Sequence, residues 1–280
     1  MIHSDNHVHT YFSSDSEEIM TEMLEEAVQQ GFSSICLTDH MDYDFPVVEA
    51  GMNYIFDADA YLQEIQDARS RFPMLEIRQG VELGLRPSVL EKCLQLTDRY
   101  PFDFVIGSTH LVEDLDPYYD LLWEKYEEKD AIRRYYEATL ENVSLPFSYD
   151  VYGHLDYILR YSPSMKRLKE NGESTDNYLE QQCKQFEDII DEILHQILNS
   201  GHGIEINTAG LKYGMGHPNP HERILSRYRE IGGEIITVGS DAHAKIHLGY
   251  QFQNAESLLA NCGFRYYTEF KHRKPVMIPL

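Results

Sequence analysis

Residues 34–40 read Ser34-Ile35-Cys36-Leu37-Thr38-Asp39-His40, a short apolar run that ends in an acidic residue and a histidine. Similar short runs recur along the chain, and longer amphipathic runs separate them, which is the βα order of an α/β protein. The short runs predict strands at 2–7, 34–38, 76–82, 102–108, 151–154, 203–207 and 234–239. The amphipathic runs predict helices near 17–30, 57–71, 87–96, 122–141, 176–198, 220–231 and 255–260.

This alternation predicts a sheet of parallel strands covered by helices. Gly31, Gly201 and Gly232 follow predicted helices, at the place where glycine commonly ends a helix. The strands, together with a further run at 266–270, favour a closed or distorted barrel. An open doubly wound sheet shows the same alternation and remains an alternative. The length of 280 residues fits a single domain that covers 1–280.

Composition excludes several classes of partner. Lys and Arg total 24 against 47 Asp and Glu, and the formal net charge of -23 repels a phosphodiester backbone, so duplex nucleic acid is not an expected partner. The four cysteines are widely spaced without a C-x-x-C pair, which indicates reduced thiols. The sequence shows neither a secretory leader nor an apolar run of about 18 residues. We therefore expect a soluble cytoplasmic protein without a membrane partner, and composition leaves the oligomeric state open.

Histidines and carboxylates gather where the predicted strands end. Residues i and i+2 of a strand point to the same side, so His7 can act with His9, and Asp241 with His243. In an α/β barrel the carboxyl ends of all strands form one rim, where residues far apart in sequence converge. Glu82 ends the third predicted strand, where its carboxylate could bridge two ions. The further candidates near these ends are Asp15, His40, His110 and His154.

Mixed imidazole and carboxylate ligands suit zinc, manganese or iron. A single histidine at a strand end is more often a structural residue than a ligand. The set is harder to explain that way, because His-x-His and Asp-Ala-His both stand at strand ends. We therefore expect a site for divalent cations.

With these motifs, the chain resembles the PHP (polymerase and histidinol phosphatase) family. The matching segments are His-x-His-Thr at 7–10, Thr-Asp-His at 38–40, Gly-Val-Glu at 80–82, Ser-Thr-His at 108–110, Gly-His at 153–154 and Ser-Asp-Ala-His at 240–243. Within the family it is most similar to the histidinol-phosphate phosphatases. That similarity rests on Gly153-His154-Leu155-Asp156 followed by Arg160-Tyr161, and on the strand that contains Glu205-Ile206-Asn207.

The resemblance implies a distorted (β/α)7, TIM-like barrel that holds two or three divalent ions. Carried over position by position, the first ion is held by His7, His9, Glu82 and Asp241, the second by Glu82, His110 and His154, and the third by Asp15, His40 and His243. Some relatives have histidine where this chain has Asp15.

The implied reaction is hydrolysis of L-histidinol phosphate, a small-molecule phosphate ester, by a hydroxide that bridges two ions in a step of histidine biosynthesis. Arg160 is expected to clamp the phosphate through its planar fork of donors. Asp39 is expected either to orient a ligand or to protonate the leaving oxygen. Tyr161 and Asn207 are expected near the substrate, although Asn207 could equally cap the following turn.

Three alternatives remain. A PHP-type phosphodiesterase or exonuclease, acting on nucleotides or single strands, shares the ligand set, although the acidic charge disfavours it. A metal-binding interaction domain without catalysis is also possible, but no expected ligand is missing. An amidohydrolase-type barrel begins with the same His-x-His but uses a bridging lysine, and Glu82 stands here instead.

Overall fold

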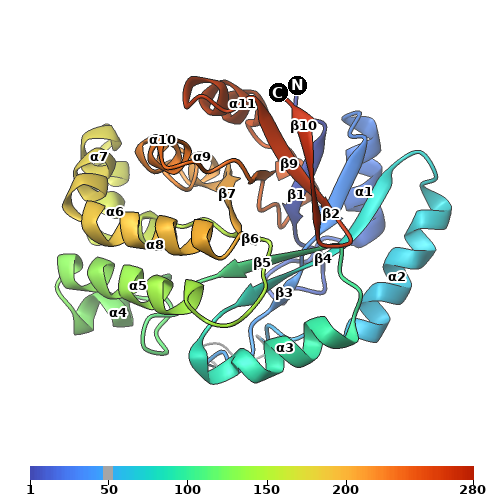
Figure 1. Ribbon diagram of the computed structural model, residues 1–280, viewed down its shortest axis with the longest axis horizontal. Coiled ribbons are helices and arrows are strands. Elements are labelled where there is room, and N and C mark those ends of the chain that lie inside the picture. Colours follow the sequence, from blue (N-terminus) through green and yellow to red (C-terminus); the bar gives the residue numbers. More distant parts are fainter. Residues whose placement is uncertain (47–52) are drawn as a thin grey trace.

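The computed structural model describes residues 1–46 and 53–280, and its centre is a parallel sheet that curls into a barrel (Figure 1). The strands are β1 (Ser4–Val8), β2 (Ser34–Leu37), β3 (His40–Met41), β4 (Glu76–Gly84), β5 (Phe104–Ser108), β6 (Val151–Tyr152), β7 (Gly203–Asn207) and β8 (Ile236–Gly239). They pair in the order β1-β2-β4-β5-β6-β7-β8, and β3 pairs with β4. The ring closes just beyond β8, where the amide of His9 donates to the carbonyl of Ala242 at 2.9 Å.

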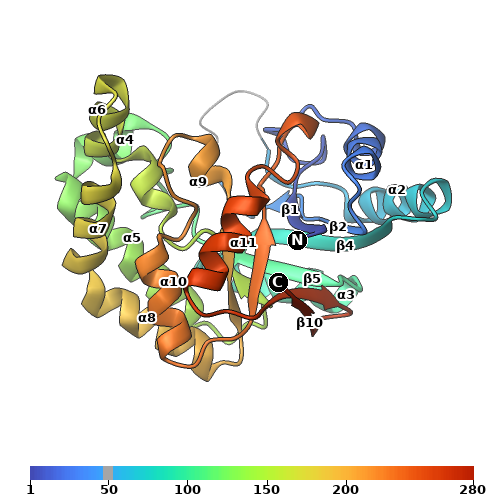
Figure 2. The ribbon, with the colours of Figure 1, turned by 90° about the horizontal axis from the view of Figure 1, so that it is seen from above.

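Helices surround this sheet (Figures 1 and 2). They are α1 (Met20–Gln29), α2 (Ala58–Arg71), α3 (Leu90–Arg99), α4 (Asp120–Lys125), α5 (Glu128–Val143), α6 (Pro163–Asn171), α7 (Asp176–Gln185), α8 (Glu187–Asn199), α9 (Ala209–Lys212), α10 (Glu222–Glu230) and α11 (Phe252–Asn261), with 3-10 turns at Pro87–Val89, Tyr157–Tyr161 and Lys245–His247. Each long helix turns an apolar face inward, as α8 does with Ile189, Ile193 and Ile197 at helical spacing.

A two-stranded hairpin closes the end of the barrel where the strands begin. It consists of β9 (Tyr266–Lys271) and β10 (Lys274–Pro279), which pair antiparallel with each other. Phe270 of β9 stacks on Phe104 with ring centroids 5.2 Å apart, and it packs in one buried cluster with Cys36, Ile106 and Val151. The predicted run at 266–270 is therefore a strand, but it lies outside the parallel barrel.

Two helices predicted as continuous are each two helices, so those predictions were wrong. The run 122–141 is divided between α4 and α5, and the run 176–198 between α7 and α8. The break in the second run occurs at Phe186, whose side chain is buried in the core. Within the residues described, no helix combines the length and apolar character that crossing a membrane requires.

Candidate functional site

A buried cluster of histidines and carboxylates, centred on Glu82, lies at the end of the barrel where the strands finish. One oxygen of Glu82, Oε2, lies 3.0 Å from His7 Nε2 and 3.2 Å from His40 Nδ1. The other oxygen, Oε1, lies 3.0 Å from His154 Nε2 and 3.2 Å from His110 Nε2. Glu82 is fully buried at the carboxyl half of β4, so residues from four other segments meet around one carboxylate.

His9 and Asp241 extend the cluster on the β1 side. His9 Nε2 lies 3.4 Å from Asp241 Oδ1 and 3.5 Å from Glu82 Oε2, yet it is buried without a hydrogen-bond partner. Asp241 adopts a left-handed backbone conformation with φ of 54°, which is uncommon outside glycine and often marks a functional site. A nitrogen lone pair that faces two carboxylates without a proton to share is an arrangement suited to a cation.

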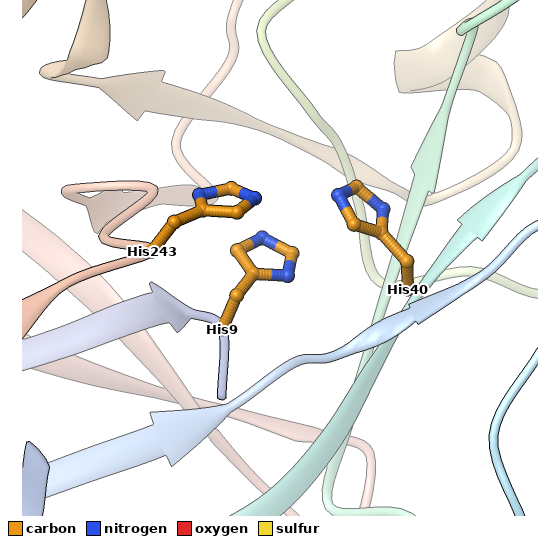
Figure 3. A group of neighbouring side chains, drawn as sticks. All are labelled: His9, His40 and His243. Carbon is orange, nitrogen blue, oxygen red and sulfur yellow. The ribbon is translucent and has the colours of Figure 1, made fainter. Parts of the chain in front are cut away.

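Asp15, His40 and His243 lie on the more exposed side of the cluster. Asp15 Oδ2 is 3.3 Å from His243 Nε2 and 3.7 Å from His40 Nε2. Figure 3 shows the rings of His9, His40 and His243 turned toward one another, with ring centroids 4.3 Å apart for His9 and His40 and 4.1 Å for His9 and His243. All nine residues predicted as ligands therefore lie in one cluster.

The carboxylates and imidazoles of the cluster shift one another's pKa values. Burial alone would raise the pKa of Glu82, but His7, His40 and His110 hold it well below its ordinary value. Burial, followed by the neighbouring His243 and His40, pushes the pKa of His9 well below its ordinary value, so its ring is neutral. A neutral imidazole beside ionised carboxylates is the donor set that transition metals bind. Four overlapping groups of three or more donors bring their ligand atoms within 4.8 Å of one another, so the cluster suits divalent cations.

Carboxylates outside the cluster accept hydrogen bonds from two of its histidines and so fix which ring nitrogen faces inward. The carboxylate of Glu205 accepts from His7 Nδ1 at 2.6 Å, and that of Asp42 accepts from His110 Nδ1 at 2.6 Å. Because an ionised carboxylate only accepts, each ring keeps a proton on Nδ1, and Nε2, which faces Glu82, is the nitrogen that can offer its lone pair to a cation. Such outer partners orient metal ligands.

Our sequence reasoning did not assign Glu205 or Asp42 to the site, although both left a signal. Glu205 lies between two isoleucines of the buried strand β7 and shares a face with Asn207, two residues on. Asp42 stands two residues after His40 and directly follows β3. The signal in both cases is a carboxylate two residues away from a predicted site residue.

Asp39 lies behind the loop that carries residues 10–13. It accepts from the amide and hydroxyl of Thr10 at 2.6 and 2.9 Å, and from the amide and hydroxyl of Ser13 at 3.1 and 2.7 Å. Since the Ser13 hydroxyl gives its proton to Asp39, it accepts from His9 Nδ1 at 3.1 Å, which leaves His9 Nε2 free to face the cluster. This geometry favours the predicted orienting role of Asp39 over the role of leaving-group acid.

Arg160 lies beside the cluster as a buried cation. Its guanidinium is 4.6 Å from the ring centroid of Tyr213 and 5.2 Å from that of Tyr157, which in turn lies 4.9 Å from the ring of His154. Within the described ranges, no carboxylate pairs with Arg160: its Nη2 donates to the side-chain oxygen of Asn219 at 3.0 Å, and its Nε has no hydrogen-bond partner. Burial opposes the cation, but the nearby Tyr161 and Asp241 keep the pKa of Arg160 above its ordinary value. The positive charge is therefore present and has no direct carboxylate partner among the described residues.

Asn207 and Tyr161 differ in how freely they could meet a ligand. The side-chain oxygen of Asn207 accepts from the amide of Ala209 at 2.9 Å, and its nitrogen donates to Glu205 at 3.1 Å and to Asp241 at 3.4 Å. Asn207 thus caps the turn after β7, and its place near the substrate stays a prediction. Tyr161 is half-buried, and its ring lies 5.1 Å from that of Tyr157, beside Arg160.

The sequence of this chain is similar to those of known proteins. Residues 5–209 match the PHP domain family. The probable histidinol-phosphatase of Clostridium acetobutylicum is 32% identical, over 93% of this chain and 94% of that protein. The histidinol-phosphatase of Lactococcus lactis is 31% identical, over 96% of this chain and 95% of that protein.

A solved structure shows the same architecture. The crystal structure of histidinol phosphate phosphatase from Lactococcus lactis, complexed with zinc, L-histidinol and phosphate, superposes with a TM-score of 0.82 over 98% of both chains, at 29% identity. The predicted distorted TIM-like barrel is thereby confirmed.

Proposed function

The chain belongs to the PHP domain family, and we propose from its site that it hydrolyses L-histidinol phosphate to L-histidinol and phosphate. The observation that carries this proposal is a buried Arg160, without a direct carboxylate partner among the described residues, beside a cluster of nine histidine and carboxylate side chains. A guanidinium without a counterion and a site for cations together suit a phosphate dianion. The reaction is a step of histidine biosynthesis, as the activity of the similar proteins implies.

We assign the cations to three subsites, and the short distances between the ligand atoms support this assignment. His7, His9, Glu82 and Asp241 would hold the first ion, Glu82, His110 and His154 the second, and Asp15, His40 and His243 the third. The second set is one of the groups whose ligand atoms lie within 4.8 Å of one another. Zinc, manganese and iron all accept such mixed ligands, and zinc is bound in the similar structure from Lactococcus lactis.

When bound, divalent cations would supply Lewis acidity that activates water and offsets the charge of the phosphate. The residues of the chain contribute position and charge. Glu82 and the histidines around it would hold the cations at the carboxyl end of the barrel. Arg160 donates to the non-bridging oxygens and stabilises the charge that they carry in the transition state. The rings of Tyr157 and Tyr213 pack against the guanidinium and keep water from it.

We further propose one domain that acts in the cytoplasm. One continuous buried core includes residues from Ile2 to Tyr267, and so joins both ends of the described chain. All four cysteines are free, which is in keeping with a reducing compartment.

A substrate panel tests the function. Metal-loaded protein is expected to release phosphate from L-histidinol phosphate with a kcat/KM at least about 100-fold above that for p-nitrophenyl phosphate, because a fitted pocket discriminates between leaving groups. Single-stranded oligonucleotides are expected to remain intact, since a net charge of -23 repels them. Preferential cleavage of the oligonucleotide would instead support the phosphodiesterase alternative.

Replacing Glu205 by glutamine tests the acceptors behind the metal ligands. One oxygen of Glu205 accepts from His7 and the other from the amide of His154 at 3.1 Å, so an amide cannot satisfy both. We expect a loss of about 10- to 100-fold in metal affinity or kcat. Metal titration and steady-state assays measure it, with Glu170→Gln on the exposed surface of α6 as the matched control. Unchanged metal affinity and unchanged kcat would contradict this role.

A further inference from the structure

Arg160 is held by a neutral group, although a carboxylate lies close behind that group. Arg160 is 4% exposed, and its Nη2 donates to the side-chain oxygen of Asn219 at 3.0 Å. Asn219 in turn donates from its side-chain nitrogen to Asp156 Oδ1 at 2.5 Å. The amide therefore stands between a buried cation and a buried anion that make no direct ion pair.

The orientation of this amide is dictated by its neighbours. Asp156 accepts from Asn219 through one oxygen and from the amide of His221 at 2.9 Å through the other, so as a carboxylate it receives protons on both sides. A guanidinium only donates. The nitrogen of the Asn219 side chain must therefore face Asp156, and its oxygen must face Arg160.

The backbone of Asn219 is fixed to the barrel. Its amide donates to the carbonyl of Asn207 at 2.8 Å and its carbonyl accepts from the amide of Asn207 at 2.7 Å, at the end of β7. A Cβ atom at Gly210 would lie 2.3 Å from the carbonyl oxygen of His217 and 2.9 Å from the side-chain oxygen of Asn219, so only glycine admits this close approach. The acceptor for Arg160 is thus held by a strand that also carries the site.

We propose that Asp156 and Asn219 form a positioning relay that aims Arg160 at the substrate phosphate without engaging it in a direct ion pair. This inference rests on the proposed function, because it assumes that a phosphate group binds at Arg160. A direct contact with Asp156 would also fix the guanidinium, but the ion pair would then have to be broken or shared when the phosphate arrived. A neutral amide supplies the hydrogen bond without the competing charge.

A double-mutant cycle on the metal-loaded protein tests the relay. The variants are Asn219→Ala, Arg160→Ala and the double variant, and calorimetry measures the Kd of inorganic phosphate for each. We expect Asn219→Ala to raise this Kd about tenfold, as loss of a hydrogen bond to a charged group does. In the Arg160→Ala background the same change is expected to have less than about a twofold effect, because residues that act through each other are not additive.

A purely structural role would give a different pattern. Asn142→Ala is the matched control, because Asn142 is a buried asparagine that donates to Thr109 at 3.0 Å and does not contact Arg160. It is expected to lower the melting temperature and leave the phosphate Kd unchanged. Equal losses for Asn219→Ala in both backgrounds overturn the relay, as does a wild-type protein that binds no phosphate.

A second variant keeps the relay testable if Asn219→Ala does not fold. Asp156→Asn frees the amide of Asn219 to turn its nitrogen toward Arg160, so the phosphate Kd is expected to rise about tenfold only when Arg160 is present. An effect that persists without Arg160 contradicts the relay. Phosphate binding with the expected cycle, but no hydrolysis of any phosphomonoester, would refute the proposed function and leave the relay intact.

Discussion

Replacing Glu82 by glutamine is expected to lower kcat for L-histidinol phosphate by at least about 1000-fold, since several kcal/mol of cation-dependent stabilisation depend on this carboxylate. Its two oxygens lie within 3.2 Å of His7, His40, His110 and His154. Glutamine has nearly the same shape, but it removes the negative charge and places an NH2 group against imidazole nitrogens. Two of the assigned subsites share this residue, so both ions are expected to bind weakly.

Metal analysis and kinetics together decide this prediction. The Glu82→Gln protein is expected to retain its fold by circular dichroism while its metal content drops, and Glu170→Gln on the surface serves again as the control. A variant with full metal content and normal kcat would show that Glu82 does not bridge cations.

Removing the metal is expected to abolish activity, with less than about 1% remaining after chelation. Addition of zinc, manganese or iron is expected to restore it, and the metal that gives the highest kcat identifies the preferred ion. Bound cations also stabilise the native state by about 2.7 kcal/mol per site at a concentration of 100 times Kd, so chelation is expected to lower the melting temperature by about 5 °C or more. The Glu82→Gln variant should show little of this shift.

Protons compete with the cations for the same ring nitrogens. Burial opposes the His7 cation, but Glu205 and Glu82 hold the pKa of His7 well above its ordinary value in the metal-free protein. At neutral pH this ring is protonated, so a metal ion must displace its proton. Apparent metal affinity is therefore expected to fall as the pH falls, and metal binding should release protons into a weakly buffered solution. A pH-independent affinity between pH 6 and about 8 would contradict this competition.

The residues of the cluster were easier to predict from the sequence than the carboxylates that orient them. Histidines at strand ends converge because parallel strands finish at one rim, and this rule alone placed His7, His110 and His154 together. Glu205 and Asp42 act through the ring nitrogen that faces away from the cluster. Which partner that nitrogen meets depends on contacts between strands distant in sequence, and spacing along one strand does not disclose it.

The fold was predictable where local signals agree with tertiary packing. Strand β7 was predicted to the residue, and α6 was missed although Ser162, Pro163 and Gly172 are ordinary signals for its two ends. The turn of the β9–β10 hairpin is His272-Arg273 with positive φ at both residues, where Asn-Gly would be usual, so its sequence carries no turn signal.

The break between α4 and α5 has a tertiary origin. Tyr126 is extended there, and its hydroxyl donates to Glu113 in a loop over the barrel. The guanidinium of Arg134 lies 4.3 Å from the Tyr126 ring centroid. These contacts outweigh a helical pattern that runs through the break without glycine or proline.

The hairpin that carries Phe270 also sets an order of events during synthesis. Until residues 266–279 emerge from the ribosome, the inner faces of Cys36, Ile106 and Val151 lack the ring that covers them. A nascent chain can pair its parallel strands before then, with this apolar surface still uncovered. Closure of this end of the barrel is therefore expected to come after β1 to β8 have been synthesised.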